Sequence, residues 1–142
     1  MRGLERRGRT DLAGMLANLD PRLLAGEFVF CSLPDARLSE IAHLNPLGTF
    51  QEPEGLTVVL PIEIAIEHEL PVGLPLRCIR LHVHSDLAAV GLTAAFSSRL
   101  AACGISANVV SGFFHDHIFV PAPDAMRAMQ ALQSLQSGNL PD

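Results

Sequence analysis

The 142-residue chain has no tryptophan and no tyrosine, so its aromatic content rests on seven phenylalanines. With 49% hydrophobic and only 18% charged residues, it is richer in apolar side chains than an average domain. We therefore expect a mostly aliphatic core. Such a composition can fill a core and still leave apolar surface, so self-association into a homo-oligomer is expected.

The sequence also has no basic stripe and no apolar run of membrane-spanning length. The net charge of −5 argues against a nucleic-acid partner, because that kind of binding depends on neutralising phosphates. Four arginines between Arg2 and Arg9 are interpreted as part of a solvated tail. The opening lacks the apolar stretch of a signal peptide, so we expect a cytoplasmic protein with no membrane partner.

Cysteine is scarce and odd in number, with Cys31, Cys78 and Cys103 each set in apolar sequence. This pattern predicts reduced core thiols rather than a disulfide framework or a zinc knuckle. A glycine-rich phosphate loop is absent as well, and Ser111-Gly112 is interpreted as part of a strand rather than a nucleophile elbow. We expect no enzyme activity, no catalytic residue and no cofactor.

The first half of the chain predicts short elements separated by irregular sequence. Helices are expected at 11–19 and 61–68, strands at 27–33 and 56–60, and helical turns at 37–44 within an otherwise irregular segment from 34 to 53. Two prolines and a glycine in residues 70–75 predict a linker.

In the second half, the sequence predicts strands at 76–83, 106–113 and 117–120. It predicts helices at 87–102, between the first two strands, and at 123–136, after the last strand. In the first strand Ile79, Leu81 and Val83 alternate with Arg80, His82 and His84, which indicates a sheet with one face on the core. In the last helix, Met126, Met129, Leu132 and Leu135 form an apolar stripe. This order is a ferredoxin-like split βαβ unit without its fourth strand. We expect the strand at 76–83 to be central and a first-half strand to take the missing place.

Several motifs resemble the ACT-domain family of regulatory modules. They are Glu54-Gly55-Leu56-Thr57, His84-Ser85 with residues 87–95, Gly104-Ile105, and residues 108–110 leading to 115–121. The chain is similar in particular to small stand-alone bacterial proteins with two ACT-like halves, related to the ACT modules of aspartate kinases. The resemblance covers roughly residues 11–136. It implies an α+β, ferredoxin-like βαββαβ fold of two intertwined ACT-like halves, 11–75 and 76–137, with an antiparallel sheet and helices packed on it.

The resemblance also implies a function: a regulatory protein that senses a small amino-acid-like ligand. A purely structural dimerisation module without a ligand is the alternative. Two departures from the family pattern stand out. Phe113 and Phe114 occupy positions where the family often carries tyrosines, and His82 is not part of the pattern.

Topology places the candidate site independently of the family. Strands 76–83 and 106–113 run parallel if a right-handed crossover joins them, so they end at the same edge of the sheet. His84 follows the first strand, and His115 and His117 follow the second. The unpaired N–H groups of a helix beginning near Asp86, with imidazoles beside them, suit a carboxylate, and Asp116 suits an ammonium group.

In the family, the loop after this strand and the start of the helix commonly contact the effector. That implication covers His84, Ser85, Asp86 and Gly91, with the hairpin residues His115, Asp116 and His117 as neighbours. Structural roles stay open for all of them. Ser85 also suits the N-cap of a helix, and Asp86 suits a favourable interaction with the helix dipole. Gly91 suits a close packing contact, and the histidines suit hydrogen bonds that close the hairpin.

A metal site is the other use of these histidines. His82-Val83-His84 and His115-Asp116-His117 are both His-x-His pairs, and three such ligands could hold zinc in a small metalloenzyme. Arg80 shares the face of His82 by alternation, however, and its positive charge disfavours a dication. We therefore expect no metal site, and the metalloenzyme is the less favoured alternative.

Overall fold

The computed structural model describes residues 12–83 and 91–138, which belong to two compact units. Unit 1 comprises the chain up to Leu24 and from Cys78 onward, and unit 2 comprises Ala25–Arg77. The opening segment therefore packs with the C-terminal half, as two intertwined halves require. The predicted division of the sequence into 11–75 and 76–137 stays a prediction.

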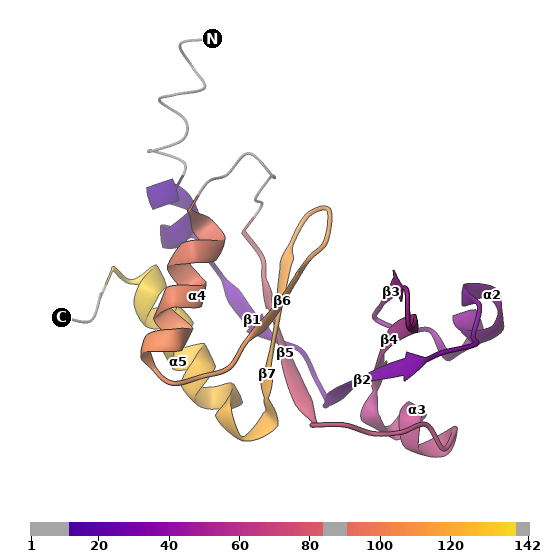
Figure 1. The fold of residues 1–142 in the computed structure, drawn as a ribbon. Coiled ribbons are helices and arrows are strands. Elements are labelled where there is room, and N and C mark those ends of the chain that lie inside the picture. Colours follow the sequence, from indigo (N-terminus) through magenta and orange to yellow (C-terminus); the bar gives the residue numbers. More distant parts are fainter. Residues whose placement is uncertain (1–11, 84–90, 139–142) are drawn as a thin grey trace, which may run out of the picture. The chain divides into compact units, whose positions relative to one another are not determined.

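Unit 1 is built on an antiparallel sheet. Its strands are β1 (Pro21–Leu23), the part of β5 (Leu76–Leu81) from Cys78 onward, β6 (Asn108–Ser111) and β7 (Asp116–Pro121). β5 lies between β1 and β7, and β6 lies beside β7 (Figure 1). β1 is antiparallel to β5, with Arg22 opposite Arg80, and β6 is antiparallel to β7. The expectations of a central strand at 76–83 and of a first-half strand in the fourth place are confirmed.

Helices cover one face of this sheet. Residues 12–17 are helical, α4 spans Leu92–Ala102, and α5 (Ala125–Gln136) follows a 3-10 turn, η2 (Ala122–Asp124). α4 and α5 lie together against the sheet (Figure 1). α4 buries side chains spaced four residues apart, which places them on one helical face. The core that results is mostly aliphatic, as expected: Ile79, Leu81, Leu92, Phe96, Leu100, Ile118, Val120 and Leu132.

One detail of α5 corrects the expected stripe. Met126 is 64% exposed, whereas Ala125, Ala128, Leu132 and Leu135 are buried. Met126 is therefore outside the core, whereas Met129 packs against it with partial burial and Leu132 and Leu135 belong to it, as expected.

Unit 2 contains β2 (Phe28–Leu33), α2 (Leu38–Ile41), η1 (Ala42–Leu44), β3 (Gly48–Glu52), β4 (Gly55–Pro61), α3 (Ile62–Glu67) and the beginning of β5. β4 pairs antiparallel with β2 and with β3, and Phe28 pairs with Leu76. The expectation that 34–53 contains no strand is wrong, because β3 lies within it. β3 shows no alternation of buried and exposed residues and includes Phe50, which is 70% exposed. The predicted linker, 70–75, contains neither helix nor strand.

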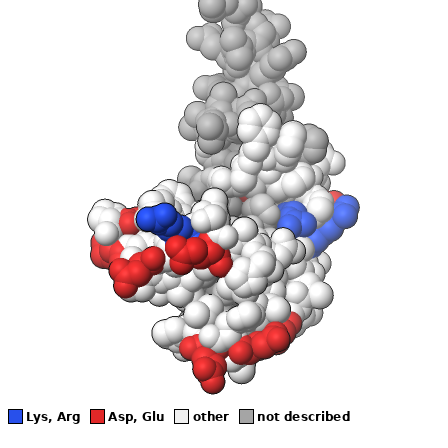
Figure 2. Space-filling view, turned by 90° about the vertical axis from the view of Figure 1, so that its right-hand side faces the viewer, with Lys and Arg blue, Asp and Glu red and all other residues white. Residues whose placement is uncertain are grey.

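Unit 2 carries most of the negative charge of the chain. Only Arg37 and Arg77 stand against eight acidic residues: Glu27, Asp35, Glu40, Glu52, Glu54, Glu63, Glu67 and Glu69. Figure 2 shows acidic side chains in several groups on one face of the molecule, with few arginines among them. Such a surface repels the phosphate backbone of a nucleic acid.

The three cysteines are all free thiols, but they differ in burial. Cys31 and Cys78 are buried, and burial raises the pKa of the Cys78 thiol to about 12, which makes it a poor nucleophile. Cys103 is exposed, so its predicted place in the core is wrong. It directly follows the last residue of α4, where the chain leaves the packed face.

Within the described residues, no helix combines the length and the apolar content that crossing a membrane requires.

Candidate functional site

A polar cluster lies on the face of the unit 1 sheet that α4 and α5 leave uncovered. Ile79, Leu81 and Val83 belong to the helix-covered core, so the alternating residues Arg80 and His82 lie on the other face. On β7, Ile118 and Val120 belong to the same core, which places His117 on the uncovered face. Two separate strands thus bring a guanidinium and imidazoles together.

Arg80 and His117 are linked directly. The Arg80 Nε–H donates to His117 Nε2 at 3.1 Å, and His117 Nδ1 lies 3.3 Å from the carbonyl oxygen of Val110. Since Nε2 accepts a hydrogen bond, the ring proton lies on Nδ1 and points to that carbonyl. This arrangement selects neutral His117. Desolvation, with the positive charge of Arg80, lowers the pKa of His117 below its ordinary value.

Besides the Arg80–His117 pair, unit 1 contains a pair of neighbouring imidazoles, His82 and His115. Their ring centroids are 5.1 Å apart, with the planes 30° from parallel. The backbone N–H of His82 donates to the carbonyl oxygen of Asp20 at 3.1 Å, which ties the end of β5 to the start of β1. Desolvation, then the charges of Arg22 and His115, lower the pKa of His82, so this ring is also held neutral near pH 7.

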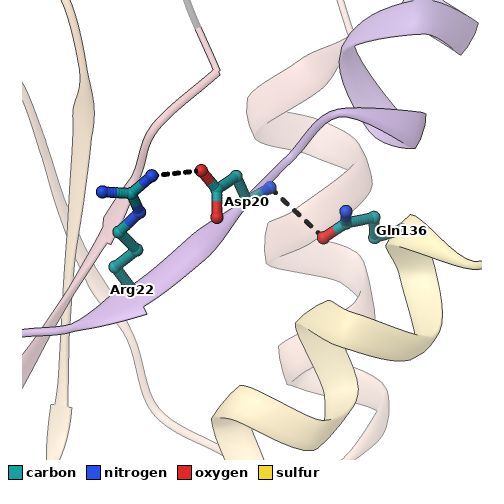
Figure 3. Close-up of polar contacts among 3 residues, drawn as sticks. All are labelled: Asp20, Arg22 and Gln136. Carbon is teal, nitrogen blue, oxygen red and sulfur yellow. Dashed lines mark hydrogen bonds and ion pairs between the residues drawn. The ribbon is translucent and has the colours of Figure 1, made fainter.

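Asp20 anchors this edge of the sheet. Its backbone N–H donates to Gln136 Oε1 at 3.2 Å, and its carboxylate is 2.8 Å from Arg22 Nη2 (Figure 3). Its φ of 47° turns the chain out of the helical segment into β1. The hydrogen bond from Arg22 lowers the pKa of the Asp20 carboxyl. The Asp20 carboxylate is therefore ionised at neutral pH and interacts electrostatically with His82.

The hairpin differs from the predicted His-Asp-His turn. The turn spans 112–115, closed by a hydrogen bond from the Gly112 N–H to the His115 carbonyl oxygen at 2.8 Å, while Asp116 and His117 belong to β7. Asp116 is only 6% exposed and accepts a hydrogen bond from the Ser111 hydroxyl at 2.5 Å. This bond gives Asp116 a structural role in the hairpin. Its predicted contact with a ligand ammonium stays a prediction.

The other predicted site residues precede α4 in the sequence. His84, Ser85 and Asp86 lie outside the described residues. Gly91 is the N-cap of α4 with a φ of 99°, so its expected place one turn inside a helix from 87 is wrong. A Cβ on Gly91 would lie 3.1 Å from Leu12 Cδ2, which indicates a packing constraint. Figure 1 shows the end of β5, the tip of the β6–β7 hairpin and the beginning of α4 at the same end of unit 1, as the topology predicts.

Sequence reasoning missed Arg80, His82, Asp20 and Arg22 as parts of the site. The alternation along 76–83 does place Arg80 and His82 on one face, but only as an argument against a metal. Asp20 and Arg22 give no such signal, because β1 is a strand only through its pairing with β5. Among residues 12–83 and 91–138, no group of three histidine, cysteine or acidic side chains is arranged to hold a metal ion.

The lowered histidine pKa values predict how stability depends on pH. Between the lowered folded-state pKa of His117 and about 6.5, the unfolded chain binds more protons than the folded one. The free energy of unfolding should therefore be constant above pH 6.5 and fall as the pH drops below it. Urea unfolding midpoints between pH 5 and 8 measure this, and His117→Gln should show a smaller fall, with the remainder due to His82. Identical pH profiles for the two proteins would contradict a neutral, desolvated His117.

Comparison of the chain with models of known protein families identifies one family in both halves of the sequence. Residues 7–77 and residues 74–134 match two family models, each described as an ACT domain. A Vibrio cholerae protein of unknown function, described as a possible transport protein, is 46% identical with a TM-score of 0.82, covering 91% of this chain and 98% of that one. No match is found among curated proteins.

Two more distant structures share the fold. An Agrobacterium tumefaciens protein is 21% identical with a TM-score of 0.67, covering 82% of this chain and 87% of that one. The ligand-free regulatory subunit of aspartate kinase from Thermus thermophilus is 12% identical with a TM-score of 0.61, covering 81% of this chain and 95% of that one.

Proposed function

The chain belongs to the ACT-domain family, and on this premise we propose that it is a regulatory protein that senses a small amino-acid-like ligand without catalysing a reaction. One observation carries the location of the binding site. Arg80 on β5 and His117 on β7 gather in unit 1 with His82, which follows β5, and His115, which precedes β7; β5 and β7 are neighbours in the sheet.

This cluster suits a carboxylate. Arg80 carries a full positive charge and keeps guanidinium N–H groups besides the Nε–H that it gives to His117. The imidazoles of His82 and His115 add ring N–H donors, and a bound anion favours the protonated form of His82. Charge-assisted bonds of this kind are about twice as strong as neutral ones.

An ammonium group needs an acceptor beside the same cluster. Asp20 offers one, because its carboxylate is partly exposed and shares the strand end with His82. Asp116, the acceptor expected from the sequence, is the alternative. By the family resemblance, the proposed site also includes Gly91 at the start of α4 and, outside the described residues, His84, Ser85 and Asp86.

The proposed regulatory output passes through contacts between copies of the chain in a homo-oligomer. A structural dimerisation module without a ligand is the second candidate, and the exposed Phe113 at the hairpin tip favours it. The two candidates differ in whether any small molecule stabilises the folded protein.

A thermal-shift series with the free amino acids tests the proposal. A ligand at 100 times its Kd adds about 2.7 kcal/mol of stability, which raises the melting temperature measurably. Arg80→Gln should weaken an amino acid that binds by about 1.5–3 kcal/mol, the range for hydrogen bonds to charged groups. Arg37→Gln is the matched control, because it removes an exposed guanidinium from unit 2 and should leave binding unchanged. A complete series without any shift, or equal binding by both variants, would reject the proposed site.

A further inference from the structure

Two phenylalanines stand exposed at the tip of the β6–β7 hairpin. Phe113 is 90% exposed and Phe114 is 58% exposed. Their rings touch edge to face, with centroids 4.8 Å apart. A hairpin turn needs only small and polar residues at its tip, so the turn itself does not account for two large apolar side chains.

The exposed rings continue into the polar cluster. The ring centroid of Phe114 lies 6.4 Å from that of His115, and His115 lies 5.1 Å from His82. The side chains thus form a row, with the apolar pair at the tip and the imidazole pair at the strand end. A molecule held by the imidazoles has an aromatic surface within a side chain's reach.

We propose that the ligand of this site is an α-amino acid with an apolar side chain, which packs against Phe114 while its carboxylate binds the imidazoles and Arg80. The inference rests on the proposed function and adds the class of amino acid. Covering the exposed ring with apolar atoms removes two apolar surfaces from water at once. A polar side chain at the same place loses hydration without gaining a partner from either phenylalanine.

The site also selects against acidic amino acids. A second carboxylate on the ligand would lie near Asp20, which is ionised beside Arg22, or against the apolar tip. The phenylalanines offer it no donor, the Asp20 carboxylate repels it, and the Arg22 guanidinium is already paired with Asp20. Glycine, which has no side chain, isolates the contribution of the carboxylate and the ammonium group.

Isothermal titration of the full chain with leucine, phenylalanine, glycine and aspartate tests this inference. Leucine and phenylalanine should bind at least about tenfold more tightly than glycine, which is what burial of about two methylene groups provides. Phe114→Ala should reduce that ratio to less than about threefold and leave glycine binding unchanged. Phe50→Ala removes a phenylalanine of unit 2 that is 70% exposed, so it should preserve the ratio.

The outcomes separate the inference from the function on which it rests. If all four amino acids bind with similar affinity, or if Phe114→Ala keeps the leucine-to-glycine ratio, the apolar class is overturned and the sensing function stands. If none of the four binds, the apolar class is overturned, and the sensing function fails as well only if the complete thermal-shift series shows no ligand. If sedimentation shows that Phe114→Ala dissociates a dimer while the ratio is unchanged, the tip is a contact between two copies and the inference is overturned.

Discussion

Replacement of Gly55 by alanine should destabilise the protein by about 3 kcal/mol or more. Gly55 has a φ of 144°, a conformation that residues with a Cβ rarely adopt. A Cβ there would lie 2.5 Å from the Cα of Pro34 and 2.8 Å from the carbonyl oxygen of Leu33. Both are backbone atoms, so relief requires the end of β2 to move away from β4. Backbone strain and overpacking each cost about 1–3 kcal/mol.

Urea unfolding followed by circular dichroism measures this change. Gly73→Ala is the matched control, because a Cβ on Gly73 has nothing within 4 Å and its φ is outside the positive range. That variant should stay within about 0.5 kcal/mol of the wild type. If the two variants had the same unfolding midpoint, the close contact between Gly55 and Pro34 would not exist in solution.

Truncation of Phe96 to alanine should cost about 3–5 kcal/mol, the range for removing a buried phenylalanine from a core. Phe96 lies in the middle of α4, is fully buried and is one of the largest side chains in the unit 1 core. Its removal leaves a cavity among Leu92, Leu100 and their neighbours on the sheet and α5. The surrounding side chains relax only partly, so the cavity adds to the lost transfer free energy.

Thermal and urea unfolding of Phe96→Ala should be compared with Met126→Ala. Met126 is also a large apolar residue on a helix of unit 1, but it is 64% exposed. Its truncation should change stability by less than about 0.5 kcal/mol. Equal losses in the two variants would mean that α4 does not pack on the sheet as described.

The sequence by itself determined most of unit 1. Alternation at 76–83 defines β5 because a sheet with one face on the core imposes a period of two. The apolar spacing and the cap at Gly104, whose φ is 71°, define the end of α4. The order of elements then fixes which strand ends meet, so it predicts that the hairpin with His115 and His117 lies at the same edge of the sheet as the end of β5. The place beside β5 is filled by β1, which precedes the rest of unit 1 in the sequence.

Only the tertiary structure decided which strand takes that place and which side chains form the cluster. β1 has three residues, and its pairing with β5, 55 or more positions away in the sequence, makes it a strand. The same holds for β3, whose exposed residues carry no pattern. The contacts of Arg80 with His117 and of His82 with His115 join residues on different strands, at distances set by packing. Local sequence carries periodicity and turn chemistry, whereas such contacts depend on how the strands pair across the whole unit.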